Sequence, residues 1–557
     1  MFEWATKEFG GGTRMRRICY AGFAAAIVLL AGCGGDDNAT ETTGTGNSTG
    51  GASVTGTAKP SGDIEKVSWA LSYEPTSLNW VYAYNYAENT VLANVCENLM
   101  RLTPDYKIEP GLAESAEHPS PTKWVYTIRS GVTFNDGSPL TAADVVFSLR
   151  RHLDPKVGSY WGSWWANVKS VEKTAPMEVT VTLKRRDVIF PQMMATPAGA
   201  IESAAFVRKQ GAKYGTPDGG LNCTGPFRLA KWSKGQNIKL VRNEGYWDSE
   251  HRARAAEADL SFLVAEATRT SALESGQVDG TFDVPPSALD KLEQSSAGKI
   301  FFGPSMQSFD VIVSNFKGPL GDVRVRRALL LALDRKGIVN AALGGRANVL
   351  RSVVSPSSWG YAEPTLRSGY DALPDPGVDL EAAKKLVEEV GSLSKPITLA
   401  TLAEDQQLSV ISLALKDAAT KLGLNLNIKT LPVGKYAPLF FDAKARQGID
   451  MFLTGWYTDI PEPLNMWATI FTSKGVSNYN GYTNPEYDRL IDEAISAEDP
   501  EARAALINKA QEIVTADVPW IPLYAPDVRV FLSNRVTGVP TTFVYLYYPW
   551  LADIGAA

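Results

Sequence analysis

The sequence KWVYTIRSGVTFNDGSPLTAADVVFSLRRHLDP, at residues 123–155, decides the fold because it contains a strand, a turn and a capped helix in succession. Aromatic and β-branched residues recur at every second position at its start, which is typical of a strand. NDG (135–137) supplies a turn with a residue that accepts a positive φ. Thr141 and Asp144 have the spacing of a capping box, and DP (154–155) ends the helix that follows. The segment predicts one unit of an α/β protein.

The same residues resemble the signature of the family 5 extracellular solute-binding proteins, W…IR.GV.F.DG.PLTA.DVVFSL. These proteins are the oligopeptide, dipeptide and nickel receptors of ABC importers. Three more stretches resemble the family in its own order, at 222–248, 271–280 and 318–347. Cys223 stands where the family has the first glycine of its GTGPF motif, which puts the local backbone in question because glycine reaches angles that cysteine does not. The resemblance covers residues 63–550.

Residues 1–32 are typical of a lipoprotein signal peptide. The apolar run 21–31 follows a basic stretch and is too short to span a bilayer, because a spanning helix needs about 20 residues. The sequence LAGC, ending at Cys33, resembles a lipobox, so we expect cleavage before Cys33 and a lipid on its thiol. Translation could start at Met1 or at Met15, since the chain from Met15 is a complete signal by itself. We therefore expect a lipid anchor at the outer face of the cytoplasmic membrane, on the extracellular or periplasmic side.

The rest of the chain predicts a tether followed by several lobes. Gly, Thr, Ser and Asn dominate 33–62, which indicates a flexible tether. The pattern is globular from 63 onward, and roughly 500 residues exceed one hydrophobic core. The resemblance implies the α/β, periplasmic-binding-protein-like (type II) fold, with two lobes of mixed sheets and an extra subdomain. We expect lobe I to contain 63–108, 207–305 and 515–557, the inserted subdomain 109–206, and lobe II 306–514.

Two features of the globular part have structural interpretations. After cleavage, Cys96 and Cys223 remain besides the lipidated cysteine. Outside the membrane they could form a disulfide, or both could be buried free thiols, because the sequence does not place their Cα atoms. Aromatic residues spaced as in SYWGSWWANV usually pack in a core, so we expect packing roles for the tryptophans of this stretch, which are Trp161, Trp164 and Trp165.

Composition argues against several function classes. The net charge is −6 and the charges are dispersed, which does not suggest a nucleic-acid binder. There are 3 histidines, and neither HExxH nor CxxC occurs, so a zinc site has no support. A glycosidase with two acids stays open, because carboxylates are plentiful and none has a distinctive spacing. We expect no enzyme, no cofactor and no metal.

The resemblance implies that the chemistry is recognition. In peptide-binding relatives the Asp of a W..D..(D/E)P segment holds the α-ammonium group of the ligand, and Asp459 matches it in GWYTDIPEP. A carboxylate suits that role because charge-assisted hydrogen bonds are the strong ones. Trp456 and Tyr457 would line the site, and Glu74 and Thr76 match a turn that lends backbone groups to the ligand. The alternatives are a turn-forming role for Asp459 and core packing for the two aromatic residues.

The implied function is a monomeric receptor that captures an oligopeptide or dipeptide between lobes that close by hinge motion. It would deliver the peptide to the permease of an ABC importer, whose separate ATPase subunits use ATP. The same role for nickel chelates, opines, haem or oligosaccharides is the alternative within this class. Few histidines argue against nickel, and the carboxylate of Asp459 favours an amine. A surface sensor or adhesin is the alternative of another class, which neighbouring genes for two permeases and two ATPases would exclude.

Overall fold

The computed structural model describes residues 55–557, except 283, 375–376, 394 and 404. The expected signal peptide, the expected lipidation site Cys33 and most of the expected tether lie outside the described residues. Within the described part, no helix combines the length and the apolar character that crossing a membrane requires.

The segment that opened the sequence analysis folds as expected. It forms β5 (Lys123–Ile128) and α2 (Ala142–Arg151), and Gly137 in the turn between them has a φ of +83°. The Asp144 carboxylate accepts hydrogen bonds from the backbone N–H of Thr141 at 3.1 Å and from its hydroxyl at 2.6 Å. The predicted strand, turn and capping interaction are therefore confirmed.

Lobe I is built on a mixed sheet of seven strands. Its central strands are parallel and its outer strands antiparallel. In spatial order the strands are β12 (Gly298–Gly303), β19 (Val528–Ser533), β11 (Gly280–Thr281), β1 (Ile64–Leu71), β10 (Ala255–Phe262), β9 (Asn237–Arg242) and β8 (Phe227–Ser233). We call this sheet and the elements packed on it lobe I.

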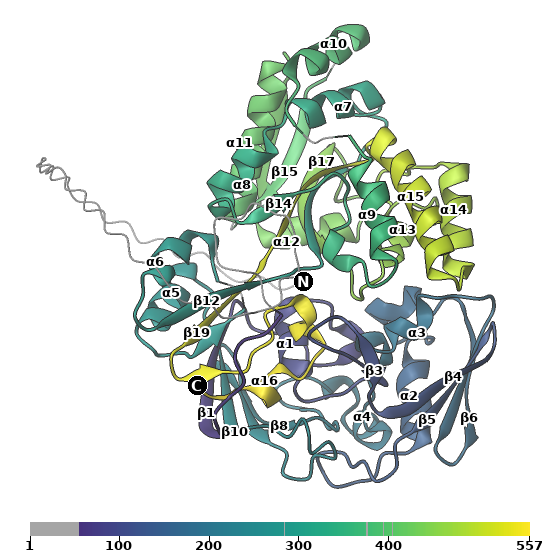
Figure 1. The fold of residues 1–557 in the computed structure, drawn as a ribbon, viewed down its shortest axis with the longest axis vertical. Coiled ribbons are helices and arrows are strands. Elements are labelled where there is room, and N and C mark those ends of the chain that lie inside the picture. Colours follow the sequence, from purple (N-terminus) through teal and green to yellow (C-terminus); the bar gives the residue numbers. More distant parts are fainter. Residues whose placement is uncertain (1–54, 283, 375–376, 394, 404) are drawn as a thin grey trace, which may run out of the picture. The chain divides into compact units, whose positions relative to one another are not determined.

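Lobe II is built on a second mixed sheet, of six strands. In spatial order they are β14 (Ala347–Val349), β18 (Trp520–Pro526), β13 (Gln307–Val313), β17 (Met451–Tyr457), β15 (Ile397–Leu402) and β16 (Leu426–Leu431). Neighbouring residues of its central strands belong to different cores: Met451 and Leu453 to one, and Phe452 to the other. Both faces of the sheet are therefore covered, as Figure 1 shows, by α7, α8, α10 and α11 on one side and α9 and α13–α15 on the other.

A third, antiparallel sheet and several short elements complete the fold. The third sheet has the order β4 (Ala113–Ser120), β5, β7 (Glu178–Leu183), β6 (Val168–Ala175). Two small ladders pair β2 (Met100–Leu102) with β3 (Ile108–Pro110), and β20 (Val536–Thr537) with β21 (Gly555–Ala556). Helix α2 packs on β6 and β7 of the third sheet.

The other helices have the following bounds. The α-helices are α1 (Tyr86–Leu92), α3 (Phe190–Met193), α4 (Ala204–Gln210), α5 (Glu266–Glu274), α6 (Leu289–Glu293), α7 (Val323–Ala332), α8 (Arg335–Leu343), α9 (Glu363–Asp371), α10 (Leu380–Val390), α11 (Gln406–Lys421), α12 (Val433–Tyr436), α13 (Leu464–Ile470), α14 (Pro485–Ser496), α15 (Pro500–Asp517) and α16 (Trp550–Asp553). The 3₁₀ turns are η1 (Trp80–Tyr82), η2 (Tyr160–Ser163), η3 (Pro197–Gly199), η4 (Gly211–Lys213), η5 (Pro286–Ala288), η6 (Pro356–Ser358), η7 (Ala437–Phe440) and η8 (Phe543–Leu546).

Two expected boundaries differ from the observed strand pairing. The chain was expected to return to lobe I at 515, but β18 pairs with β13 and β14 of lobe II, and the return follows it, between Pro526 and Val528. The expected tether was to end at 62, but Thr57 N–H donates to Val539 O at 3.0 Å and Ser61 N–H to Ala556 O at 2.9 Å. Composition does not reveal this, because the groups that hold Thr57 and Ser61 lie at the other end of the chain.

The two cysteines that the sequence left open form a disulfide. Cys96 and Cys223 are bonded with their Cα atoms 4.8 Å apart, and both residues are buried. The bond joins the segment after α1 to the segment before β8. Among the described residues other than glycine, the positive φ angles belong to Tyr106, Ala362 and Val518. Cys223 therefore replaces a glycine here without a left-handed backbone.

Candidate functional site

Strand β17 carries the candidate site from the centre of the lobe II sheet toward lobe I. After Tyr457 the chain leaves the sheet and turns through Glu462 into α13. Glu462 is fully buried, accepts hydrogen bonds from the Tyr361 hydroxyl at 2.7 Å and from Leu464 N–H at 3.1 Å, and pairs with Arg503 at 3.5 Å. This network fixes the proline-flanked turn and with it the position of the preceding residues.

Asp459 is a half-buried carboxylate that the protein does not neutralise. The Tyr547 hydroxyl donates to its Oδ1 at 2.8 Å. Burial raises the pKa of Asp459 to about 6, and the hydrogen bonds from Tyr547 and Asn465 oppose that rise. Among the described residues, no Lys, Arg or His nitrogen lies within 4.0 Å of this carboxylate. Above about pH 6 the site therefore holds a negative charge without a cationic partner.

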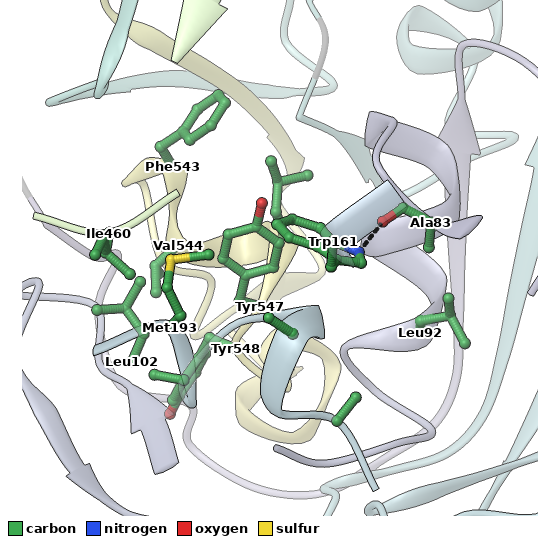
Figure 2. Close-up of a cluster of buried hydrophobic side chains, with 14 of the residues drawn as sticks. Ala83, Leu92, Leu102, Trp161, Met193, Ile460, Phe543, Val544, Tyr547 and Tyr548 are labelled. Carbon is green, nitrogen blue, oxygen red and sulfur yellow. Dashed lines mark hydrogen bonds between the residues drawn. The ribbon is translucent and has the colours of Figure 1, made fainter. Parts of the chain in front are cut away.

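The partner of Asp459 comes from the far end of the chain. Tyr547 directly follows η8 and is buried, and Figure 2 shows it among Val544, Met193 and Trp161. These residues belong to the C-terminal segment and to the stretch between β5 and α4, so two distant parts of the chain meet beside a loop of lobe II. The packing holds the hydroxyl in place for Asp459.

Tyr457 also bridges the two lobes. Its hydroxyl donates to Tyr84 O at 2.8 Å, and its ring lies 5.7 Å from Tyr86 and 4.9 Å from Phe543. Burial, and then the charge of Asp459, raise the pKa of Tyr457 well above its ordinary value. The structure therefore places Tyr457 and Asp459 where lobe II meets lobe I, and a contact of either with a ligand stays a prediction.

The other expected site residues have different surroundings. Trp456 lies 5.7 Å from Trp520 and 6.5 Å from Tyr479, both rings of lobe II. The Glu74 carboxylate accepts hydrogen bonds from Trp232 Nε1 at 2.9 Å and from Gly235 N–H at 3.0 Å, so it holds the turn between β8 and β9.

Thr76 is likewise engaged within lobe I. Its N–H and hydroxyl both donate to Glu88 at 2.9 Å. The resemblance implies that this turn contacts the ligand through its backbone groups. That contact stays a prediction. The segment between β1 and this turn is tied to α1 through the Tyr73 hydroxyl, which accepts a hydrogen bond from Ala87 N–H at 3.2 Å.

Sequence reasoning missed the residues that surround Asp459 from outside the motif. Tyr547 lies in a tyrosine-rich stretch, and Tyr160 is the neighbour of tryptophans that we expected to pack. The pKa of Tyr160 is raised by burial and then by the charge of Asp459. An aromatic residue beside other aromatic residues usually indicates a core, so these sequences gave no separate signal for a site.

Contacts outside the candidate site also join the third-sheet region to lobe II. Val188 N–H donates to Ile495 O at 3.0 Å, and Arg186 pairs with Glu498 at 3.2 Å. Arg185 forms an ion pair with Asp492 of α14. Because these contacts lie between the segment after β7 and α14, they hold the two parts against each other at a distance from Asp459.

The sequence matches the model of the bacterial extracellular solute-binding proteins, family 5 Middle, over residues 107–478. The chain belongs to this family. It is 25% identical over 463 residues to the periplasmic oligopeptide-binding protein OppA of Escherichia coli (strain K12), covering 78% of this chain and 82% of that protein. It is 29% identical over 507 residues to heme-binding protein A of Haemophilus influenzae (strain ATCC 51907 / DSM 11121 / KW20 / Rd), covering 85% and 89%.

Solved structures confirm the fold. The oligopeptide-binding protein AppA from Bacillus subtilis, solved with a nonapeptide, has a TM-score of 0.76 and 24% sequence identity and covers 90% of this chain and 100% of its own. The expected family, and the type II fold with two lobes and an inserted subdomain, are confirmed. Proteins of this family are extracytoplasmic receptors that bind solutes.

Proposed function

We propose that the protein binds a peptide between its lobes, holds the peptide's α-ammonium group at Asp459, and delivers it to the permease of an ABC importer. The carboxylate of Asp459 carries this proposal. It is half-buried between lobe II and the C-terminal segment and has no cationic partner in the described chain. Burying an ionised group without a counter-charge is unfavourable, and a ligand ammonium removes that cost.

The relatives support a peptide and leave its length open. OppA is named for oligopeptides, GsiB of Escherichia coli for glutathione, and the AppA structure contains a nonapeptide. Heme-binding protein A and AgaA, which was solved with agropinic acid, represent the alternative ligands within this class. Asp459 favours ligands with an amine over haem, because the carboxylates of haem would repel it.

The proposal also covers the anchor and the partners. The protein acts as a monomer and meets separate permease and ATPase subunits. A lipid on Cys33 holds it at the outer face of the membrane, and the Cys33→Ser variant should therefore appear in the medium or the periplasm. Retention of this variant in the membrane fraction after a salt wash would contradict the lipid anchor.

Calorimetry on ligand-stripped protein tests the amine contact. Short peptides should bind and raise the melting temperature, and N-acetylated peptides should do much less, because they lack the ammonium. A water-excluded ammonium–carboxylate contact is worth about 1.5–3 kcal/mol. Asp459→Ala should therefore weaken peptide binding roughly tenfold to a hundredfold, with Asp459→Asn in between.

Asp417→Ala is the matched control, because Asp417 is an exposed acid of the same lobe. It should bind peptides as the unmodified protein does. Equal binding of free and acetylated peptides, or unchanged affinity in well-folded Asp459→Ala, would contradict the amine contact. A response only to sugars, opines, haem or metal chelates would establish one of the alternative ligands.

A further inference from the structure

Three aromatic rings from three parts of the chain meet beside the candidate site. Tyr84 and Tyr160 are stacked with their centroids 4.6 Å apart and their planes 19° apart, and Phe441 meets Tyr84 edge-on at 6.1 Å. Tyr84 follows η1 in lobe I, Tyr160 begins η2 in the stretch after α2, and Phe441 follows η7 in lobe II. Phe441 is 65% exposed and Tyr160 is 45% exposed. We call these three residues the aromatic platform.

Two of the rings are held rigidly by the segments that carry them. Trp161 is buried, and its Nε1 donates to Ala83 O at 3.0 Å, as Figure 2 shows. The Tyr82 hydroxyl donates to Val157 O at 2.9 Å, and the Ser159 hydroxyl to Val81 O at 3.3 Å. The residues on either side of Tyr84 and Tyr160 are thus tied to each other. Tyr160 is exposed and Tyr84 is partly buried, although the backbone of both is fixed, which is how a preorganised binding surface is built.

The aromatic platform adjoins Asp459. The backbone oxygen of Tyr84 accepts the hydrogen bond from Tyr457, which lies two residues before Asp459. Tyr160 stacks on Tyr84, and burial, then the charge of Asp459, raise the pKa of its hydroxyl. The exposed rings of Tyr160 and Phe441 therefore both contact Tyr84, the residue that ties this cluster to the segment leading to Asp459.

We propose that Tyr84, Tyr160 and Phe441 form the subsite for the side chain nearest the ligand's amino group, and that this subsite takes an aromatic or large aliphatic side chain. The inference rests on the proposed function, because Asp459 sets where the ligand begins. Aromatic rings pair at centroid distances of about 4.5–7 Å, which leaves the exposed faces of Tyr160 and Phe441 suited to a further ring. An acidic side chain would meet these apolar faces and the charge of Asp459, so it should be rejected.

The contribution of Phe441 adds a conformational requirement. The other two rings belong to the lobe I side, whereas Phe441 comes from lobe II. The subsite is therefore complete only when the two lobes are together, so an aromatic side chain that spans the three rings favours the closed form. Ligand specificity and lobe closure would share the same residues.

Calorimetry with tripeptides X-Ala-Ala tests the inference, with X being Phe, Leu, Ala or Asp. Phe and Leu should bind about tenfold more tightly than Ala, and Asp should bind most weakly, since burying one large apolar side chain supports a change of about this size. Tyr160→Ala and Phe441→Ala should each reduce the ratio of the affinities for Phe-Ala-Ala and Ala-Ala-Ala, measured on the same variant, from about ten to nearly one. Tyr160→Phe keeps the ring and should keep the preference.

Leu413→Ala is the matched control, because Leu413 is 63% exposed but lies on α11, which packs on the other face of the lobe II sheet from α13–α15. It should not change the preference. Equal affinity for all four peptides would overturn this inference and leave the proposed function standing. An unchanged preference in folded Tyr160→Ala and Phe441→Ala, the latter an exposed position whose replacement should be tolerated, would also overturn it. Absence of binding by every free peptide would overturn both proposals.

Discussion

Replacing Asp459 by Asn should make the ligand-free protein more stable at neutral pH, although it should weaken peptide binding. Burial raises the pKa of Asp459 from its ordinary 3.8 to about 6. At 1.36 kcal/mol for each tenfold change in proton affinity, holding this carboxylate ionised costs roughly 3 kcal/mol at most. Its partial exposure reduces the cost, so we expect a gain of about 1–3 kcal/mol in the free energy of unfolding. The Asn side chain still accepts the hydrogen bond from Tyr547.

The sign of the effect depends on pH in a definite way. The pKa of Asp459 is higher in the folded than in the unfolded protein, so protonation stabilises the folded state. That stabilisation is complete below about pH 4 and is lost as the pH rises through about 6. The Asp459→Asn variant has no such group. Its advantage over the unmodified protein should therefore be largest above about pH 6 and should disappear near pH 4.

Thermal melts of ligand-stripped protein at pH 7.5 and pH 4.5 measure this difference. A chain of this size has an unfolding entropy of roughly 1 kcal/mol/K, so the gain corresponds to about 1–3 °C at neutral pH. Asp417→Asn is the control and should show neither the gain nor its pH dependence. A variant that is less stable at pH 7.5 would refute the reasoning, because it would mean that Asp459 serves the fold. An advantage as large at pH 4.5 as at pH 7.5 would refute it as well, because the gain would then not come from the ionised carboxylate.

Three further predictions follow from the site and its supports. Peptide affinity should decrease as the pH falls below about 6, because protonation of Asp459 removes the charge that the ammonium needs. Titration calorimetry at pH 5 and pH 7.5 measures this, and equal affinities at the two pH values would contradict it. Cys223→Ser should lower the free energy of unfolding by about 2–5 kcal/mol in denaturant melts, since it removes the bond to Cys96, and an unchanged midpoint would contradict a structural role. Arg185→Glu should speed ligand release a few-fold, because it turns the attraction to Asp492 into repulsion. Stopped-flow experiments at low salt measure the release rate. An unchanged rate would show that this contact does not hold the lobes together.

The local features of the fold could be predicted from the sequence, and the long-range ones could not. The capping interaction of Thr141 and Asp144 involves residues three positions apart, so the sequence contains all of it. The partner of Asp459 is 88 positions away, at Tyr547, and no local pattern connects the two. The motif therefore located the carboxylate and said nothing about the hydroxyl that orients it. Strand β18 belongs to the lobe II sheet because it pairs with β13, which is distant in the sequence. No local pattern shows this pairing, so the expected boundary between lobe II and lobe I was placed too early, at 515.

The aromatic residues were ambiguous for a different reason. Trp161 and Tyr160 are adjacent in a stretch that we expected to pack, and the structure buries the first and exposes the second. In a short 3₁₀ turn, neighbouring side chains point in different directions, so composition could not separate the anchor from the surface that it positions. The two cysteines behaved similarly, because their pairing depended on a Cα distance that only the fold supplies.

The order of strands in lobe I has a consequence for how the protein is made. Strand β19 is among the last elements of the chain, yet it lies between β12 and β11, and β11 in turn pairs with β1 near the other end. The sheet is incomplete until β19 has been made, because the position between β12 and β11 is empty until then. A chain that emerges from its amino end would therefore have an incomplete lobe I sheet for most of its synthesis. Late completion of the sheet suits an exported receptor, because such a chain must stay unfolded until it has crossed the membrane to the compartment where its ligand is found.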